Sequence, residues 1–468
     1  MPMTKRSLGP LAWIRAFSRA NGANVSIIFA FSLIPMIGLV GLGVDYGVAL
    51  SAKAKFDNAA DAAAIAAVAT VKAYVAANPQ DPTLRSDAVK AGLDRAKRAF
   101  ATNVGTVPFA TTPTPQITLA PDPVHFQTFT ATVSYTASTN NNFGQLFNVK
   151  SNAISGFASA AVDIPSYLDF YIMLDVSGSM GLPTSSDGQA KLAANNGGCL
   201  FACHFQGNAN GYKFAHGRDS IKLRVDSVDS AVYQLIQTAK QTQTLQNQYR
   251  IGLYPFIVDA VQAAPLSSDY HQALQLVTDK SKSPTDPAFF YPLGDNYLDS
   301  GVANQHIDID GTSIGSGGTH FENIFPDLYK HRSGIGNGAT PATPKAFIFL
   351  VTDGMDNSQT QSNGNWSNTQ GLSPNSQPQE PKNMLSYCQY AQSLGYYVSI
   401  LYIPYITLND SESQSIQANS VSSNSKLYND LKQCASAGFM FQANSDADIT
   451  NAMQAMFSQA IQVAHLNK

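Results

Sequence analysis

The feature that most constrains this chain is a charge-free apolar stretch that runs from about Ala20 to Val44. An α-helix rises about 1.5 Å per residue, so roughly 20 apolar residues cross the hydrocarbon layer of a bilayer. The stretch therefore predicts a transmembrane helix, which we place at residues 24–47. A cleaved secretory signal is the alternative, because Ala52-Lys53-Ala54 resembles a small-x-small cleavage site. Length favours a retained helix, since secretory signals usually hold about 7 to 15 apolar residues.

Basic residues precede the apolar stretch at Lys5, Arg6, Arg15 and Arg19. Positive charge next to a membrane helix usually stays on the cytoplasmic side. We therefore expect residues 1–23 to be a cytoplasmic segment and the bulk of the chain to be periplasmic or extracellular, in a bacterial cell envelope.

Composition limits the partners of the outer part. The chain has 468 residues, 29 basic and 32 acidic, and a net charge of -3. At about 150 residues per domain, this length suggests roughly three folding units. A balanced charge gives no broad positive field, so we expect no nucleic-acid partner.

Residues 48–165 change from helical to strand-like character. An alanine-rich segment continues the helix to about Tyr74, either as an exposed stalk or as a surface that packs against another helix or a sheet. Within residues 126–135, β-branched residues recur at alternate positions, which predicts a strand. Residues 147–162 predict further short strands. The region therefore predicts a small α+β unit.

Three stretches of this N-terminal part resemble the TadE/TadG-like family of the tight-adherence (Flp) pilus machinery. They are residues 21–30 (NGANVSIIFA), residues 43–46 (GVDY) and residues 59–64 (AADAAA). The resemblance implies a membrane helix that runs into an alanine-rich helix. Prepilin-like processing would need an acidic residue five positions after Gly22, where this chain has Ile27. We therefore expect an unprocessed, anchored protein.

A second informative feature is the apolar segment at residues 168–174, which ends in Asp175-Val176-Ser177-Gly178-Ser179. Alone, Asp-x-Ser-x-Ser is explained about as well by a helix cap or a tight turn. Two more residues with oxygen-bearing side chains lie next to expected turns or strand ends. Thr319 follows a pair of glycines, and Asp353 follows the apolar segment 346–351. Ligands of open parallel α/β sheets bind at the carboxyl ends of the strands. These hard oxygen donors favour Mg²⁺ over zinc or copper.

The same residues resemble the metal-ion-dependent adhesion site (MIDAS) of the von Willebrand factor type A (VWFA) domain. The resemblance covers residues 166–468 and implies an α/β fold, a Rossmann-like domain with a mainly parallel sheet between helices. Further strands at 250–258, 345–351 and 396–403 and a helix at 446–464 agree with that order. The resemblance implies Mg²⁺, Ca²⁺ or Mn²⁺ held by hydroxyls and carboxylates of five residues, namely Asp175, Ser177, Ser179, Thr319 and Asp353.

A cation held by two carboxylates and neutral hydroxyls can accept one more acidic oxygen from outside. We therefore expect metal-dependent binding of a protein ligand that has an exposed acidic residue, in Flp pilus assembly or surface attachment. An envelope scaffold unrelated to pili is the alternative. A Mg²⁺-dependent hydrolase is a weaker one, because the region lacks a recognised nucleophile or His-Glu-x-x-His arrangement. We predict no enzyme and no catalytic residue.

The four cysteines form two groups, Cys199 with Cys203 and Cys388 with Cys434. An outer location makes disulfides plausible for both groups, although four cysteines allow three pairings. Joining the second group would restrict the unfolded chain more than closing the short loop of the first.

Two insertions distinguish the predicted domain from a minimal one, at about residues 181–217 and 356–381. The second is rich in Asn, Gln, Ser and Pro, which is typical of a variable loop. Both insertions could instead form a rim that selects the ligand.

Overall fold

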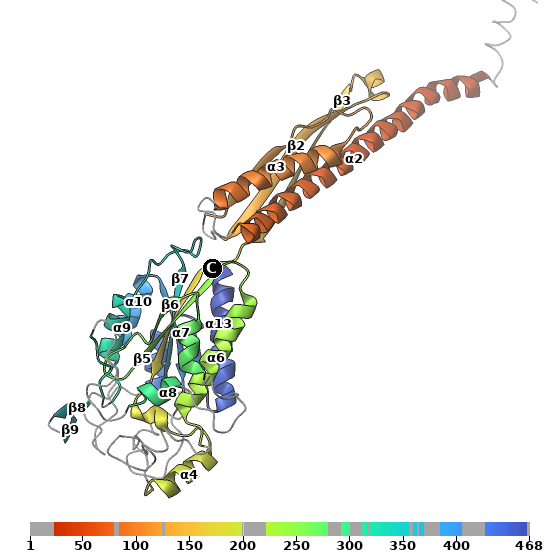
Figure 1. Ribbon diagram of the computed structural model, residues 1–468. Coiled ribbons are helices and arrows are strands. Elements are labelled where there is room, and N and C mark those ends of the chain that lie inside the picture. The colour runs from red at the N-terminus through yellow and green to blue at the C-terminus, as the bar shows by residue number, and fades with distance from the viewer. Residues whose placement is uncertain are drawn as a thin grey trace, which may run out of the picture. The chain divides into compact units, whose positions relative to one another are not determined.

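The structure, a computed structural model, forms two compact units (Figure 1). Unit 1 comprises the chain up to Asp122 together with Thr128–Asp163, and unit 2 comprises Pro123–Gln127 together with Ile164–Lys468. The described residues are 23–78, 84–123, 127–198, 200, 221–278, 292–299, 311–316, 318–354, 359–362, 365–368, 384–404 and 426–465.

Unit 1 is built around one continuous helix, α2 (Ala23–Ala77), which joins the apolar stretch to the alanine-rich segment. A second helix, α3 (Leu84–Val104), and a three-stranded antiparallel sheet pack against it. The sheet has the order β1 (Gln116–Pro121), β2 (Thr128–Asn140), β3 (Ser151–Asp163). The predicted small α+β region is confirmed. Its last segment is one strand rather than several, because β3 pairs with β2 in unbroken register from Ser151 to Asp163.

Small side chains explain how α2 packs inside unit 1. The alanines of one face are at most 1% exposed, namely Ala59, Ala60, Ala63, Ala64 and Ala67. Without longer side chains, neighbouring backbones approach closely. Asp57 ties this helix to the sheet, since it accepts a 2.6 Å hydrogen bond from the Tyr135 hydroxyl and pairs with Lys53 at 2.8 Å. The alanine-rich segment is thus a packing surface.

Unit 2 contains a six-stranded sheet in the order β11-β10-β7-β4-β5-β6. All neighbouring strands are parallel except β6, which is antiparallel to β5. The strands are β4 (Leu168–Asp175), β5 (Tyr249–Phe256), β6 (Ala264–Ser267), β7 (Lys345–Thr352), β10 (Tyr396–Tyr402) and β11 (Met440–Gln442). The predicted α/β class with a mainly parallel sheet is therefore confirmed.

Helices cover both faces of this sheet (Figure 1). One face packs under α6 (Arg224–Thr242), α7 (His271–Val277), α8 (Pro292–Tyr297) and α13 (Asp446–His465). The other packs under α9 (Phe321–Lys330), α10 (Met384–Ser393) and α12 (Lys426–Cys434). Alternate residues of β4 face the two layers, so Phe170 and Ile172 lie in one core and Tyr171 in the other. Burial on both faces explains why β4 and β7 are nearly uninterrupted apolar runs.

The two predicted insertions contain local structure. The first includes the short helix α4 (Ser186–Asn195), which begins where the Ser185 hydroxyl accepts a 3.1 Å hydrogen bond from the Gly188 amide. The second includes an antiparallel pair, β8 (Gln359–Ser362) and β9 (Asn365–Asn368). The rest of the second insertion, and residues 199 and 201–217 of the first, lie outside the described residues.

Candidate metal-ion site

The predicted site lies at the edge of the sheet where the central parallel strands end. β4 ends at Asp175, which is opposite Phe256, the last residue of β5. On the other side of β4, Leu174 is opposite Val351, two residues before Asp353. Parallel pairing thus brings the loops after β4, β5 and β7 to one edge, as expected for ligand sites of such sheets.

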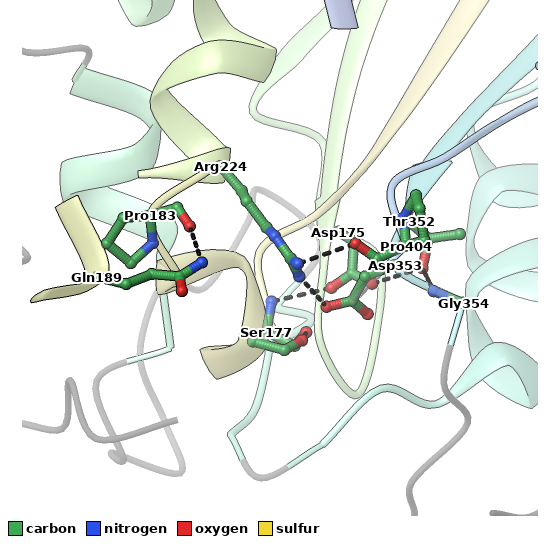
Figure 2. Close-up of polar contacts among 10 residues, drawn as sticks. Asp175, Ser177, Pro183, Gln189, Arg224, Thr352, Asp353, Gly354 and Pro404 are labelled. Atoms are coloured by element: carbon green, nitrogen blue, oxygen red, sulfur yellow. Dashed lines mark hydrogen bonds and ion pairs between the residues drawn. The ribbon is translucent and has the colours of Figure 1, made fainter. Parts of the chain in front are cut away.

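The loop after β4 folds back on the carboxylate of Asp175 (Figure 2). The Ser177 amide donates a 3.0 Å hydrogen bond to Oδ1 of Asp175. The hydroxyls of Ser177 and Ser179 lie 3.1 Å apart, and a short 3₁₀ turn, η2 (Gly178–Gly181), follows. All three side chains are buried. The Asp-x-Ser-x-Ser spacing therefore gathers one carboxylate and two hydroxyls within a single tight turn.

Thr352, the last residue of β7, orients the same carboxylate. Its hydroxyl donates a 2.6 Å hydrogen bond to Oδ2 of Asp175 and accepts a 2.8 Å bond from the Gly354 amide (Figure 2). Both oxygens of Asp175 are thereby held by β4 and β7 together. Sequence reasoning did not select Thr352, although its place directly before Asp353 at a strand end was the available signal.

Arg224 is a second site residue that sequence reasoning missed. Its Nη1 lies 3.6 Å from Oδ2 of Asp353, and the side chains of Arg224 and Asp353 are 1% and 0% exposed. Its Nη2 donates a 3.0 Å hydrogen bond to the carbonyl of Pro404, which follows β10 (Figure 2). Arg224 opens α6, whose start is fixed by a 2.8 Å bond from the Arg224 amide to the carbonyl of Leu182. No local pattern distinguishes this arginine from a surface charge.

The two carboxylates of the site influence each other. Burial, and next the charge of Asp353, raise the pKa of Asp175, while hydrogen bonds from Ser177 and Thr352 oppose the rise. Burial disfavours the ionised form of a carboxyl group, and a neighbouring negative charge adds to that cost. An additional positive charge at this edge would relieve the repulsion.

Thr319 lies at the same edge because the residue after it is hydrogen-bonded to the end of β5. The amide of the next residue, His320, donates a 2.9 Å hydrogen bond to the carbonyl of Ile257, which directly follows β5. Thr319 is 3% exposed. The structure describes Thr319 and the other four predicted residues, and it contains no hydrogen bond from the Thr319 hydroxyl to any of them. Asp175, Ser177, Ser179 and Asp353 thus come together, and Thr319 lies at the same edge.

The chemistry of these side chains fits a hard divalent cation. Carboxylate and hydroxyl oxygens suit Mg²⁺, which needs few protein ligands because it keeps several waters. In the part of the chain that the structure describes, no three His, Cys, Asp or Glu side chains gather. A site of two carboxylates and hydroxyls is consistent with that finding. The contacts described above include two buried carboxylates and one guanidinium, which pairs with Asp353, so a cation would balance the remaining negative charge.

The second pair of predicted cysteines is bonded. Cys388 on α10 and Cys434 on α12 form a disulfide, and both are buried under the sheet. This pairing restricts the unfolded chain more than closing the short loop between Cys199 and Cys203 would. Cys199 and Cys203 lie outside the described residues.

Unit 2 is an α/β unit with a mainly parallel sheet between two layers of helices, which is the architecture that the resemblance to VWFA domains implied. Residues 23–70 match the protein family described as "Putative Flp pilus-assembly TadE/G-like". The N-terminal region is therefore TadE/G-like, as the sequence resemblance implied. No curated protein matches the chain significantly.

Remote structural likenesses were found with several solved proteins. Proximal thread matrix protein 1 from the mussel byssus is 12% identical with a TM-score of 0.32, over 64% of this chain and 49% of its own, so the chain spans about half its length. A second structure of that protein is described with a zinc-occupied MIDAS motif. The PilB minor pilin from Streptococcus sanguinis is 12% identical with a TM-score of 0.33, over 75% of this chain and 79% of its own. The vWF domain of the type V pili tip protein Mfa5 from Porphyromonas gingivalis is 12% identical with a TM-score of 0.34, over 65% and 98%.

Proposed function

We propose that this chain is a membrane-anchored protein of Tad pilus assembly or surface attachment, and that it binds a protein ligand through a divalent cation. The TadE/G-like match of residues 23–70 supports the pilus context. The observation that carries the binding role is the buried pair Asp175 and Asp353, which shares one sheet edge with the hydroxyls of Ser177 and Ser179. The family description names pilus assembly and not a catalysed reaction, so we propose a binding role and no enzymatic one.

The anchor in this proposal is the N-terminal part of α2. The helix is long and apolar enough to cross a membrane by length and composition, although a signal sequence passes the same test. We assign residues 1–23 to the cytoplasm, 24–47 to the membrane, 48–165 to a stalk and 166–468 to the binding domain. In this orientation the domain faces the periplasm or the outside of the cell.

Asp175, Ser177, Ser179, Thr319 and Asp353 would hold the cation, with Mg²⁺, Mn²⁺ or Ca²⁺ as candidates. When bound, such an ion supplies an electrophilic position that an acidic side chain of a partner can occupy. The chain's own residues prepare that position. Thr352 and the Ser177 amide fix both oxygens of Asp175, and Arg224 offsets part of the charge of Asp353. The hydroxyls add no charge, so the site stays receptive to an anion.

Metal binding is tested by calorimetric titration of Mn²⁺ and Mg²⁺ into the full chain in detergent. Ser179→Ala removes one oxygen donor, and we expect it to weaken binding by about tenfold or more, as for the loss of one well-placed polar contact. Asp187→Ala is the matched control, because Asp187 lies on α4 with its side chain 78% exposed. Equal affinity in the wild-type protein and Ser179→Ala would contradict the proposed site.

The pilus context needs a separate test. Crosslinking in cells with and without a chelator, followed by identification of the bound proteins, distinguishes a role in pilus assembly from a role as an envelope scaffold unrelated to pili. Metal-dependent capture of Flp pilus components would support assembly. Capture of only other envelope proteins, with the same metal dependence, would favour the envelope scaffold.

A further inference from the structure

The turn that joins β2 to β3 carries an exposed apolar surface. We call residues 141–150 the hairpin tip. Four of its large apolar side chains face outward, Phe143 at 38%, Leu146 at 74%, Phe147 at 49% and Val149 at 45% exposed. Exposed apolar side chains that gather in this way mark a binding surface more often than a random part of a protein's exterior.

Asp45 of α2 fixes the position of the hairpin tip within unit 1. Its Oδ1 accepts a 3.0 Å hydrogen bond from the Asn142 amide, and its Oδ2 accepts bonds of 3.0 and 2.7 Å from the amides of Phe143 and Gly144. Asp45 is only 4% exposed. Charge-assisted bonds of this kind are among the stronger ones in proteins. The turn is therefore held against α2 at the end of the apolar stretch.

Two glycines let the hairpin tip lie along the apolar stretch itself. A Cβ atom at Gly38 would come within 2.4 Å of Cζ of Phe147, and one at Gly41 within 2.5 Å of Cβ of Phe143. The aromatic rings thus cover bare helix backbone. Gly38 is seven residues before Asp45, so Phe147 contacts α2 about 10 Å further into the apolar stretch than Asp45 does.

The helix surface beside the hairpin tip is also apolar and exposed. At the level of Gly38 and Gly41, exposed side chains include Ile37 at 50%, Leu39 at 71% and Val40 at 69%. The helix and the hairpin tip thus form one continuous apolar surface within unit 1. Lys150 and Asn142, at the ends of the tip, are exposed as well, and polar side chains there suit the headgroup region of a bilayer.

We propose that the hairpin tip embeds in the lipid bilayer beside α2, in the leaflet on the side of the folded units. Leu146 and Phe147 would contact acyl chains, while Lys150 would lie near the phosphates. This inference rests on the proposed membrane anchor, because the tip shares its apolar surface with that helix. A lipid surface is the occupant that this continuity favours, since the tip lies at the depth of the exposed helix side chains. A protein partner would instead need to cover both the exposed face of α2 and the hairpin tip.

Depth-dependent fluorescence quenching by brominated lipids tests the proposal. Trp13 and Trp366, the two tryptophans of the chain, are first replaced by phenylalanine in the full-length protein, which is then placed in phosphatidylcholine vesicles. Single tryptophans are then introduced as Leu146→Trp in the hairpin tip and as Val40→Trp in the helix. A third variant, Phe157→Trp, is the matched control, because Phe157 is 69% exposed on the same hairpin but six residues beyond Ser151. That spacing is about 20 Å along the strand.

We expect Leu146→Trp and Val40→Trp to be quenched, with the tip variant quenched most by lipids brominated near the headgroup, and Phe157→Trp to be unaffected. Quenching of Val40→Trp with none in Leu146→Trp would overturn the proposal while leaving the anchor intact, and it would point to a protein partner for the tip. If Val40→Trp is not quenched either, both the anchor and the inference fail. Far-UV circular dichroism of each variant verifies that the protein keeps its secondary structure.

Discussion

The guanidinium of Arg224 lies 3.6 Å from the carboxylate of Asp353, and neither side chain is exposed to water. This contact supplies the proposed metal site with a fixed positive charge from within the chain. With Asp175 as the second carboxylate, these three side chains carry a net charge of about -1 when both acids are ionised. A bound divalent ion would then make the net charge of the site positive, which explains how the site could attract an acidic ligand.

Loss of Arg224 should destabilise the metal-free protein. In Arg224→Met, the buried Asp353 loses its ion pair with Arg224, and removing one partner of a buried pair typically costs about 3–5 kcal/mol. We expect that loss in the free energy of unfolding when a chelator is present, and a partial recovery when Mg²⁺ is added. Urea denaturation under the two conditions measures both effects.

Arg224→Lys is the control for this prediction, because it keeps the charge but loses the forked geometry. Its loss of stability should be smaller than that of Arg224→Met. Equal stability of Arg224→Met and the wild-type protein in chelator would show that the ion pair contributes nothing.

Thr352 provides a second test of the site. Thr352→Val keeps the shape of the side chain but removes the hydroxyl that bonds both Asp175 and Gly354. Loss of a hydrogen bond to a charged group costs about 1.5–3 kcal/mol, so we expect a loss in that range together with weaker Mn²⁺ binding. Thr352→Ser retains the hydroxyl and should lose less than about 1.5 kcal/mol and keep its Mn²⁺ affinity. The idea that Thr352 orients Asp175 is untenable if Thr352→Val binds Mn²⁺ as tightly as Thr352→Ser.

The sequence predicted the parts of the site that depend on local spacing. Asp175, Ser177 and Ser179 lie within one turn after a buried strand, so the strand pattern alone places them at a sheet edge. The same pattern in β7 located Asp353. Apolar runs are strong signals because burial on both faces of a parallel sheet leaves few alternatives.

The sequence could not predict contacts that depend on tertiary placement. Arg224 begins an amphipathic helix, where a positive residue normally faces water, and only the packing of α6 against the sheet directs it to Asp353. Likewise, nothing near Asp45 indicates that its carboxylate accepts three amides from a turn about 100 residues later. The cysteine pairing cannot be read from the sequence for the same reason, because only the fold places α10 and α12 under one face of the sheet.

The disulfide between Cys388 and Cys434 should stabilise unit 2 by limiting its unfolded state. The two residues are 46 positions apart, and crosslinks over loops of this length typically contribute about 2–4 kcal/mol. We therefore expect the double variant Cys388→Ala, Cys434→Ala to lose that amount in urea denaturation. Wild-type protein treated with a reductant is the control and should lose a similar amount. An unchanged denaturation midpoint in both samples would contradict this role.

Lys345 should make the stability of unit 2 depend on pH. It is the first residue of β7, is 5% exposed, and its Nζ donates a 3.1 Å hydrogen bond to the carbonyl of Ala464. Burial lowers the pKa of Lys345 to about 8, from an ordinary value near 10.5. Below pH 8 both the folded and the unfolded chain are protonated at this lysine. Between about pH 8 and 10.5 the unfolded chain binds a proton that the folded chain has lost, so this lysine makes the protein more stable as pH rises.

The usable window ends near pH 10, because buried tyrosines then act in the opposite direction. Burial raises the pKa of Tyr249 to about 12, so its ionisation favours the unfolded chain once the pH exceeds about 10. Within pH 8 to 10, Lys345 should add about 2 kcal/mol to the free energy of unfolding. Lys345→Met removes this titration, so the difference in stability between wild-type and variant should shift by that amount across the window. Urea denaturation followed by far-UV circular dichroism at several pH values measures the shift, and parallel pH profiles would show that Lys345 is protonated alike in both states.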